Sequence, residues 1–470
     1  MTVFSAMGWF NPATIMNAAG EKAVANFDED SITMAAAAGL KCTKDLDAEQ
    51  FGAVYFASTT APFKERQNAT IVAGALGLNE EIRAADFAGS VKSGTTALLA
   101  AIEFAAMAEG EMALACAADC RLGRAGSVQE MVFGDGGAAF AVGSAGVIAE
   151  YKGSYSISCD FVDHLRGANS KYDRQWEERW IRDVGYDRLI PQVIGGICKK
   201  YGLQLAELAK VIYPCYYPGA RKNINRKLSL RPDQVQDDLM MDAGDTGSAH
   251  PLMMLAAALE TASPGEKLLV ASYGNGCDAL LFEVTAAIEK FPNRNRVSDA
   301  VKNNIELASY LKYLTWREML PVEIGMRGEE EKLTRWSIAW RSRKAILSLQ
   351  GTRCRQCGTQ QYPPQRICVN PDCGAIDHME PAALADGGGK IVSFTSDLLA
   401  ATTNPPAIYG TVDFRGGGRS MMDFTDCVLE DLKVGGPVSF TFRIKYFDPR
   451  RDTTFYFWKA VPGKEVTEGG

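Results

Sequence analysis

The chain has 470 residues, of which 47% are hydrophobic and 23% charged, so it is long and apolar enough for two or more domains with sizeable cores. Its net charge of -7 gives no basis for binding nucleic acid or an anionic membrane surface. No stretch approaches the roughly 18 consecutive apolar residues of a membrane-spanning helix, and residues 1–19 lack the basic start of a secretory signal. We therefore expect a cytoplasmic protein.

The first part of the chain alternates predicted helices and strands. Acidic residues open a run of small and apolar residues over Asp28–Lys41, which predicts a helix, and Ala69–Gly77 predicts another. Runs that are apolar on both faces predict strands over Gly52–Ser58, Met112–Cys120 and Gly137–Gly143. Strands of this kind belong to sheets that are covered by helices on both sides, so the predicted fold class is α/β.

The stretch Asp86–Leu98, DFAGSVKSGTTAL, leads into the almost uniformly apolar run Leu99–Met107. A helix that is apolar on every side is usually buried in a large domain, and glycine in the preceding turn lets backbone amides approach a ligand. The N-terminus of such a helix favours anions and lowers the pKa of a thiol placed on it. We therefore expect a candidate active site at the start of this helix.

A polar, aromatic segment over Glu150–Arg188 is interpreted as an inserted lobe or cap on the substrate side. A second alternation follows it. Its predicted elements are a helix over Leu189–Lys200, a strand over Ala209–Tyr217, a helix over Pro251–Ala262, and a β-pair of Lys267–Ser272 with Ala279–Val284.

Four of the twelve cysteines fall close together, as Cys354-Xaa-Xaa-Cys357 and Cys368-Xaa4-Cys373. Tetrahedral Zn(II) takes four thiolates, and each closely spaced pair can direct two sulfur atoms to one ion. The pattern predicts a structural zinc site. A reduced cysteine-rich loop or a ribbon that has lost its metal is the alternative. The other eight cysteines have no paired spacing, which suits a reducing compartment.

Short β-runs separated by glycine-rich turns follow the cysteines and predict a small β-barrel. They cover Lys390–Asp397, Ala407–Asp413, Val438–Tyr446 and Thr454–Ala460. Barrels of this kind also bind nucleic acid, but residues 351–470 carry thirteen Lys and Arg against fourteen Asp and Glu. This balance lacks the basic footprint that nucleic-acid binding requires.

Several motifs together resemble the thiolase superfamily, in particular 3-hydroxy-3-methylglutaryl-CoA synthase and ketoacyl synthase III. They are Gly20–Gly39, VYFAST, TIVAGALGL, the turn at Asp86–Leu98, GDTGSAHP and SYGNGCDA, in family order. The resemblance implies a layered αβαβα domain over residues 1–325, usually a homodimer core. The end of the chain resembles zinc-ribbon/OB-fold proteins of acyl-CoA metabolism, which implies a rubredoxin-like zinc ribbon at 350–380 and an OB-fold barrel at 381–470. Before them, a charged run and a Trp- and Arg-bearing stretch predict a linker and helix at 326–349, with the helix over Thr334–Leu349.

The resemblance also implies where the catalytic groups of the synthases would lie. The acyl-accepting cysteine falls at Val91, the acid/base glutamate at Thr59, the carbonyl-orienting histidine near Tyr213, and the asparagine of Gly-Asn-Thr at Asp245. Acyl transfer needs a nucleophile and carbanion formation needs a base. The usual mechanism on a cysteine of this chain is therefore not expected.

Other residues near these positions are candidates for chemistry. Cys215 is a possible displaced nucleophile or a packed thiol, and Asp245 with His250 is a possible acid/base pair or a structural one. Tyr213 is a possible proton donor or a packed aromatic ring. Lys92, with Ser93 beside it, is a candidate contact for an anionic acyl group or CoA, or else a solvated lysine at a helix start.

Three functions follow from these expectations. The first is an acyl-CoA-binding subunit that acts with a true thiolase in a heteromeric complex, where the complex makes or thiolytically cleaves a carbon-carbon bond next to a thioester. The second is a stand-alone aldolase or retro-aldolase acting on a 3-hydroxyacyl-CoA. The third is a non-catalytic structural partner. The expected cofactors are structural Zn(II) and a coenzyme A thioester as substrate or ligand.

Overall fold

The structure is a computed structural model that describes residues 2–5, 9–11, 14–16, 21–291, 296–302, 305–307, 309–323 and 334–463. The chain forms two compact units. The first comprises Met1–Ala25, Asp30–Thr70 and Glu80–Ser309, and the second comprises Asn26–Glu29, Ile71–Asn79 and Tyr310–Gly470. The predicted linker near residue 325 lies outside the described residues, so the proposed domain boundaries stay a prediction.

Two four-stranded sheets form the frame of the first unit. The strands of the first sheet are β5 (Phe51–Ala57), β6 (Arg83–Phe87), β7 (Met112–Asp119) and β8 (Gly136–Val142). In the order β6-β5-β7-β8, β5 is parallel to both neighbours and β8 is antiparallel to β7. The strands of the second sheet are β9 (Ala149–Ser158), β12 (Leu208–Ile212), β13 (Lys267–Tyr273) and β14 (Gly276–Val284), in the order β12-β13-β14-β9.

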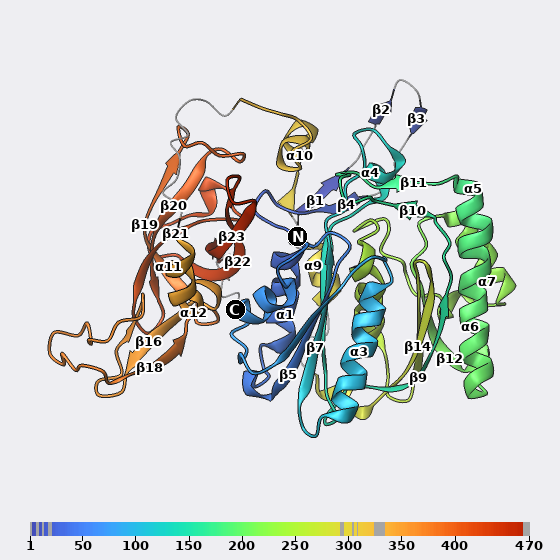
Figure 1. The fold of residues 1–470 in the computed structure, drawn as a ribbon, viewed down its shortest axis with the longest axis horizontal. Helices are drawn as coiled ribbons and strands as arrows, with labels where there is room; N and C mark the ends of the chain where they lie inside the picture. The colour runs from blue at the N-terminus through green and yellow to red at the C-terminus, as the bar shows by residue number, and fades with distance from the viewer. Residues whose placement is uncertain are drawn as a thin grey trace, which may run out of the picture. The chain divides into compact units, whose positions relative to one another are not determined.

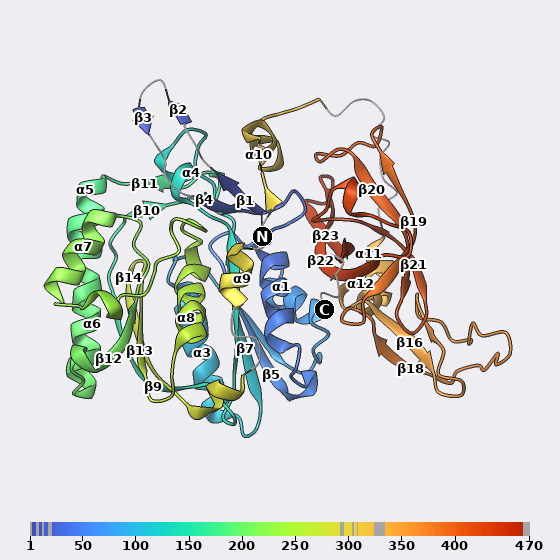
Figure 2. The ribbon, with the colours of Figure 1, turned by 180° about the vertical axis from the view of Figure 1, so that it is seen from behind.

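Helices cover both sheets and fill the space between them. They are α1 (Ser31–Thr43), α3 (Ser93–Met107), α6 (Asp187–Tyr201) and α8 (His250–Thr261). Helix α1 packs on β7 and β8, α3 and α8 lie between the sheets, and α6 packs on β9, β13 and β14. Figures 1 and 2 show the resulting order of layers, α1, first sheet, α3 with α8, second sheet, α6. The predicted α/β fold in αβαβα layers is confirmed.

Local sequence explains where the central helices begin. Helix α1 starts at Ser31 because the Asp30 carboxylate accepts a hydrogen bond from the Thr33 amide and Thr33 caps Asp30 in return. Helix α3 lies close to its neighbours because its buried face carries small residues such as Ala97 and Ala101. Its last residue, Met107, is 86% exposed, so the expectation of a helix buried on every side is wrong at this end.

Smaller elements of the first unit surround these layers. They are β1 (Thr2–Ser5), β2 (Trp9–Asn11), β3 (Thr14–Met16), β4 (Glu21–Val24), β10 (His164–Leu165), β11 (Arg174–Gln175), β15 (Ile305–Glu306), α4 (Val128–Val132), α5 (Glu178–Trp180), α7 (Pro218–Lys227) and α9 (Arg296–Lys302). Helix α2 (Asn68–Ala75) runs from the first unit into a segment of the second.

Two predictions about this unit are corrected. The segment Glu150–Arg188 is not wholly an inserted lobe, because its start is strand β9, which pairs with β14 along its length. The predicted strand Ala209–Tyr217 ends at Ile212, and the residues after it form a loop in which Pro214 lacks the amide hydrogen that a strand ladder needs.

The second unit contains the zinc ribbon and the barrel. The ribbon has β16 (Gln350–Cys354), β17 (Gln360–Gln361) and β18 (Met379–Ala383), in the order β17-β16-β18. The barrel has β19 (Gly389–Asp397), β20 (Ala407–Phe414), β21 (Arg419–Asp423), β22 (Pro437–Asp448) and β23 (Thr453–Pro462), in the order β21-β20-β19-β22-β23. Phe424 pairs with Ala460, which brings the two edges together.

Phe442 and Trp458 are buried in the barrel, and the Trp458 indole donates a hydrogen bond to the Leu347 carbonyl. The sequence analysis missed strand β21. It also predicted one helix over Thr334–Leu349, where the structure has two, α11 (Trp336–Arg341) and α12 (Arg343–Leu347). Helix α10 (Tyr310–Trp316) precedes them. Within the described residues, no helix is both long and apolar enough to cross a membrane.

Candidate active site and metal centre

The turn between β6 and α3 is fixed from two sides. The Lys92 ammonium group lies 3.2 Å from both carboxylate oxygens of Asp278 on β14, and the Thr95 hydroxyl donates to the same carboxylate. The Ser90 hydroxyl donates to the Gly274 carbonyl at 2.8 Å. These contacts hold the start of α3 against the turn between β13 and β14. The Lys92 ammonium group is engaged by Asp278 in this structure.

Glycine at two positions allows this close packing. A Cβ atom on Gly94 would lie 2.0 Å from the Ser248 carbonyl oxygen, and one on Gly274 would lie 2.9 Å from a methyl group of Val91. Both distances are shorter than van der Waals contact. Any larger residue would push the first turn of α3 away from the loops that surround it.

A small cavity of about 20 Å³ lies beside Val91. A space of this size holds about one water molecule. Its lining comes from the turn before α3, the turn before α6, the loop after β12, the end of β13, and the loop before α8 together with the first turn of that helix. The lining residues are Val91, Tyr186, Pro214, Cys215, Tyr216, Met240, Asp245, Gly247, Pro251, Ser272 and Tyr273.

Tyrosines form one wall of this cavity. The rings of Tyr186 and Tyr273 lie 4.4 Å apart, and Tyr216 lies 4.3 Å from Tyr217. The Tyr216 hydroxyl donates to the Tyr217 hydroxyl at 3.2 Å. Burial raises the pKa of all four phenols. They are therefore neutral hydrogen-bond donors at physiological pH and do not act as bases.

Cys215 lines the cavity but is a poor nucleophile. Its side chain is buried, and its thiol lies 3.5 Å from the Tyr217 carbonyl. Burial raises the pKa of this thiol to about 12. Because the thiolate is the reactive form of cysteine, Cys215 is almost wholly unreactive near neutral pH.

Asp245 lies in the cavity wall as one half of a buried ion pair. Its carboxylate is 2.8 Å from the Arg121 guanidinium group and accepts a hydrogen bond from the Gly247 amide at 3.0 Å. Burial alone would raise the pKa of Asp245, but the positive charge of Arg121 outweighs it and holds that pKa below its usual value. Asp245 is therefore ionised.

His250 begins helix α8 with both ring nitrogens engaged by the protein. Nδ1 accepts a hydrogen bond from the Thr246 amide at 3.0 Å, and Nε2 lies 2.7 Å from the Asp238 carbonyl oxygen, to which it donates. Burial lowers the pKa of His250 to about 4. His250 therefore lies near Asp245, but its imidazole is neutral and neither ring nitrogen is free.

Tyr213 and Thr59 lie away from the cavity lining. The Tyr213 hydroxyl donates to the Asn225 side chain on α7 at 2.5 Å. The Thr59 amide and hydroxyl both donate to the buried carboxylate of Asp119, at 2.7 and 3.0 Å. The same carboxylate accepts a hydrogen bond from the Ser248 amide, so it joins the loop after β5 to the loop before α8.

Ser93 is buried in the first turn of α3, and its hydroxyl makes no hydrogen bond within the part of the chain that the structure describes. A buried hydroxyl without a partner is uncommon, because its desolvation is not compensated. The predicted role of Ser93 in binding a ligand stays a prediction.

The sequence analysis missed five polar residues of this region. Asp119 ends strand β7 and Arg121 follows it two residues later, at the carboxyl end of a parallel sheet, where residues often reach a site. Tyr273 is the last residue of the buried strand β13. Asp163 and His164 are adjacent in the polar cap, and an aspartate beside one of only three histidines was the available signal.

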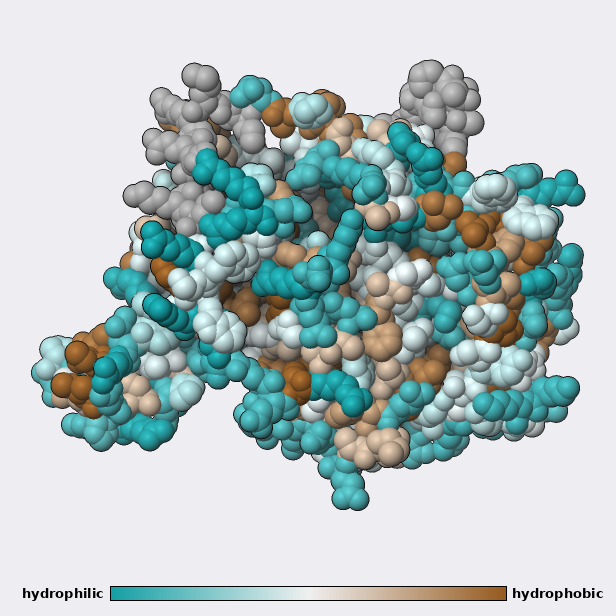
Figure 3. All heavy atoms as spheres, in the orientation of Figure 1, coloured by the Kyte–Doolittle hydropathy of each residue, from teal (hydrophilic) through white to brown (hydrophobic). Residues whose placement is uncertain are grey.

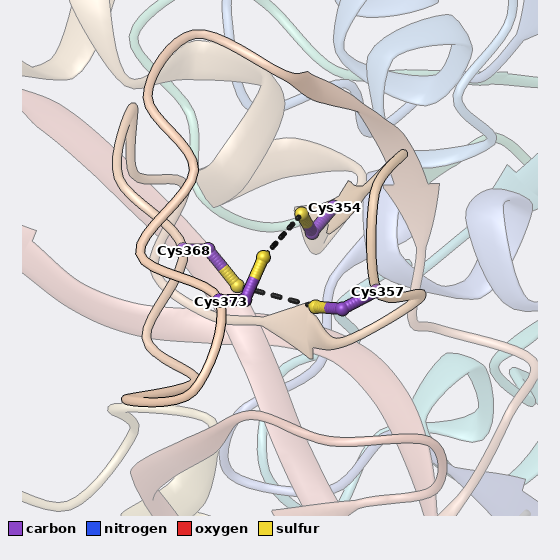
Figure 4. A group of neighbouring side chains, drawn as sticks. All are labelled: Cys354, Cys357, Cys368 and Cys373. Atoms are coloured by element: carbon purple, nitrogen blue, oxygen red, sulfur yellow. Dashed lines mark hydrogen bonds between the residues drawn. The ribbon is translucent and has the colours of Figure 1, made fainter.

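The four ribbon cysteines are brought together, with all sulfur atoms within 4.8 Å of one another (Figure 4). The Cys354 and Cys373 sulfurs are 3.8 Å apart, and those of Cys357 and Cys368 are 3.4 Å apart. Four sulfurs at the usual Zn–S distance are about 3.8 Å apart, so the site fits a tetrahedral zinc ion. Gly358 and Gly374 follow the second cysteine of each pair at positive φ, which lets the chain turn sharply there.

Residues 344–377 match the family model described as ChsH2, rubredoxin-like zinc ribbon domain. The chain is also similar to the hydroxymethylglutaryl-CoA synthase of Methanopyrus kandleri, with 30% identity over 307 residues that cover 64% of this chain and 87% of the relative. It is 32% identical to the synthase of the same name from Pyrococcus furiosus over 305 residues, which cover 62% of this chain and 86% of that protein.

Solved structures share the fold. A crystal structure of an HMG-CoA synthase complexed with CoA has a TM-score of 0.57 at 16% identity, and the match covers 67% of this chain and 85% of that chain.

Proposed function

Because the chain belongs to the hydroxymethylglutaryl-CoA synthase family, we propose that its first unit binds an acyl-CoA thioester at the Val91 cavity without forming an acyl-enzyme. The observation that carries the proposal is Val91 itself. It lines the cavity where the family resemblance places the acyl-accepting cysteine, and its isopropyl group has no nucleophilic atom. The thiol of Cys215, which lines the same cavity, is kept protonated by burial.

A true thiolase is the proposed source of the missing nucleophile. In this proposal the chain is a subunit of a heteromeric complex, with a homodimeric core, that makes or cleaves a carbon-carbon bond next to a thioester. Apolar side chains that are more than half exposed support a protein partner. They gather at the tip of the zinc ribbon (Figure 3) and are Ile367, Val369 and Ile376. Zinc in this ribbon would be structural, because four thiolates leave no position open for substrate.

The location of the chain is proposed from its cysteines. All twelve lie in the described part of the chain, and none forms a disulfide. A reducing compartment such as the cytoplasm suits this state.

The test is to isolate the tagged full-length protein from its own cells and to measure subunit composition by native mass spectrometry, with zinc content on the same sample. We expect one zinc ion per chain and a cysteine-bearing thiolase in fixed ratio. Adding that thiolase to the purified protein should produce turnover of an acyl-CoA that neither protein gives alone. Isolation as a zinc-loaded homodimer without a thiolase would contradict the partner role.

A second candidate function is favoured by the neutral tyrosines of the cavity wall. Cleavage of a 3-hydroxyacyl-CoA by a retro-aldol reaction needs proton transfer and stabilisation of an enolate, and it needs no acyl-cysteine. Tyr273 and Tyr216 are hydrogen-bond donors beside the cavity. Turnover by the purified protein alone, unaffected by thiol alkylation, would favour this function over the subunit role.

A further inference from the structure

Tyr273 lines the Val91 cavity, and its hydroxyl lies beside the Asp163 carboxylate. Its ring lines the cavity, the residue is 4% exposed, and its buried hydroxyl makes no hydrogen bond of acceptable geometry among the described residues. Burial and the nearby Asp163 carboxylate both raise the pKa of this phenol. A buried, protonated hydroxyl without a partner is ready to donate to an oxygen atom of a ligand.

His164 is oriented by the residue before it. Nδ1 of His164 lies 3.0 Å from Oδ1 of Asp163, and the same oxygen accepts a hydrogen bond from the His164 amide at 2.7 Å. The other ring nitrogen, Nε2, is 3.9 Å from a carboxylate oxygen of Asp173, which is beyond hydrogen-bond distance. The imidazole is therefore held by Nδ1, while Nε2 remains able to exchange a proton.

The β10–β11 hairpin directs His164 toward the tyrosine wall. His164 pairs with Gln175 across the hairpin, and residues paired in this way point to the same face. The Gln175 amide group donates to the Tyr217 hydroxyl, and Tyr217 packs against Tyr186 and Tyr216, which line the cavity.

The segment after His164 also reaches the position of the family's missing base. Arg166 donates a hydrogen bond to the Thr59 carbonyl, and Thr59 stands where the family resemblance places the acid/base glutamate. His164 lies two residues before Arg166, so the segment that carries the imidazole is tied to the loop from which the glutamate carboxylate is absent.

We infer that His164 and Tyr273 form an acid–base pair at the Val91 cavity that exchanges a proton with the α-carbon of a CoA thioester, with Asp163 as the positioning residue. The inference rests on the proposed binding of a CoA thioester. It assigns the base to the cap segment of this chain and makes the exchange independent of any acyl-cysteine.

The step is a simple enolisation. The α-carbon–hydrogen bond breaks, the proton moves to Nε2 of His164, and the electron pair moves through the carbonyl group to the thioester oxygen. Tyr273 donates a hydrogen bond to that oxygen as negative charge develops on it. Asp163 stabilises the imidazolium cation. Return of a proton from Nε2 to carbon restores the thioester, so no further reactant is consumed.

The test uses full-length protein with acetyl-CoA as the probe in deuterium oxide. Mass spectrometry of the recovered acetyl-CoA measures deuterium in its methyl group, and calorimetry measures binding separately. We expect exchange above the uncatalysed rate with the wild-type protein. His164→Ala and His164→Asn should each reduce the exchange rate about 100-fold, and Tyr273→Phe should reduce it at least tenfold. All three variants should keep their affinity for acetyl-CoA.

Two controls separate a chemical role from a structural one. Added imidazole should restore exchange in His164→Ala, which a purely structural role of His164 would not allow. The matched variants His378→Ala, at an exposed histidine of the second unit, and Tyr201→Phe, at an exposed tyrosine of α6, should exchange at the wild-type rate. Asp163→Asn should lower the rate while binding is kept.

Three results would overturn the inference. Exchange at the wild-type rate in a folded His164→Ala variant would show that His164 is not the base. Binding of acetyl-CoA without any exchange would contradict the enolisation step but would still support the proposed binding function. An absence of acetyl-CoA binding would overturn the proposed function itself, and this inference with it.

Discussion

His250 and Asp245 are five residues apart, and burial affects their protonation in opposite ways. Burial keeps His250 neutral and lowers its pKa to about 4. Burial of Asp245 is opposed by Arg121, whose positive charge keeps the carboxylate ionised and its pKa below the usual value. The two groups therefore affect stability in different pH ranges.

The acid sensitivity of the first unit should depend on His250. The unfolded chain binds a proton at this residue below pH 6.5, whereas the folded chain resists protonation until about pH 4. The contribution of His250 to the free energy of unfolding is thus fully present above pH 6.5. It falls by about 3 kcal/mol in total as the pH falls to about 4. The loss from Asp245 begins only below its usual value of 3.8.

His250→Gln should remove most of the fall in stability between pH 6.5 and 4, because the glutamine side chain does not titrate and its amide can still donate to the Asp238 carbonyl. Urea unfolding of the first unit at several pH values measures this pH dependence of stability. An unchanged pH profile in the variant would show that another group causes the acid sensitivity.

At the scale of elements, helix α3 depends on close backbone contact at Gly94. A Cβ atom there would lie 2.0 Å from the Ser248 carbonyl oxygen. Gly94→Ala should therefore destabilise the first unit by about 2–4 kcal/mol, because two backbone segments must separate. The matched control is Gly195→Ala on the exposed face of α6, where nothing lies within 4 Å of the added atom. The control should be neutral or stabilising by up to about 1 kcal/mol. Equal unfolding midpoints for the two variants would contradict this account.

The zinc ribbon should depend on metal for its local structure. Its strands are short, and few apolar residues besides the cysteines are buried between the two cysteine turns. Chelation, or Cys354→Ser, should release zinc and increase hydrogen exchange over residues 350–383, while α3 and α8 keep their protection. Cys42→Ser, at a partly buried thiol of α1, is the control that should keep zinc. Full zinc content in Cys354→Ser would contradict the four-cysteine site.

At the scale of the whole molecule, the second unit is built from segments that are far apart in sequence. Asn26–Glu29 belongs to this unit together with the barrel. The buried Asp28 carboxylate lies 2.9 Å from the Lys459 ammonium group and 3.5 Å from the Arg443 guanidinium group. The Asp28 carbonyl accepts a hydrogen bond from the Ile444 amide.

Asp28→Ala should therefore destabilise the barrel, whose strands β22 and β23 lie more than 400 residues away in sequence, by about 3–5 kcal/mol, because it leaves buried cations short of a partner. Hydrogen exchange should increase over β22 and β23. Asp45→Ala, at an exposed residue, should leave these strands unchanged. Unaltered protection of β22 and β23 in Asp28→Ala would contradict the role of this ion pair.

The sequence predicted the layers and the metal ligands better than the candidate active site. Apolar runs located β5, β7, β13 and β14, and cysteine spacing selected four thiols that the structure brings together. The cavity could not be predicted in the same way, because its wall comes from several loops whose side-chain directions depend on tertiary contacts. The Tyr213 hydroxyl bonds to Asn225 on α7, whereas Tyr273, which lies in the SYGNGCDA motif but was not predicted as a site residue, lines the cavity with Val91.

The central claim is that the first unit binds a CoA thioester without taking up its acyl group. The most direct measurement is intact-mass spectrometry of the purified protein after incubation with acetyl-CoA, together with calorimetric binding on the same sample and a cysteine-bearing synthase as the positive control. We predict saturable binding with no added acetyl mass, while the control protein gains one acetyl group. An acetyl group on the wild-type chain, mapped to Cys215 or to any other residue, would contradict the claim.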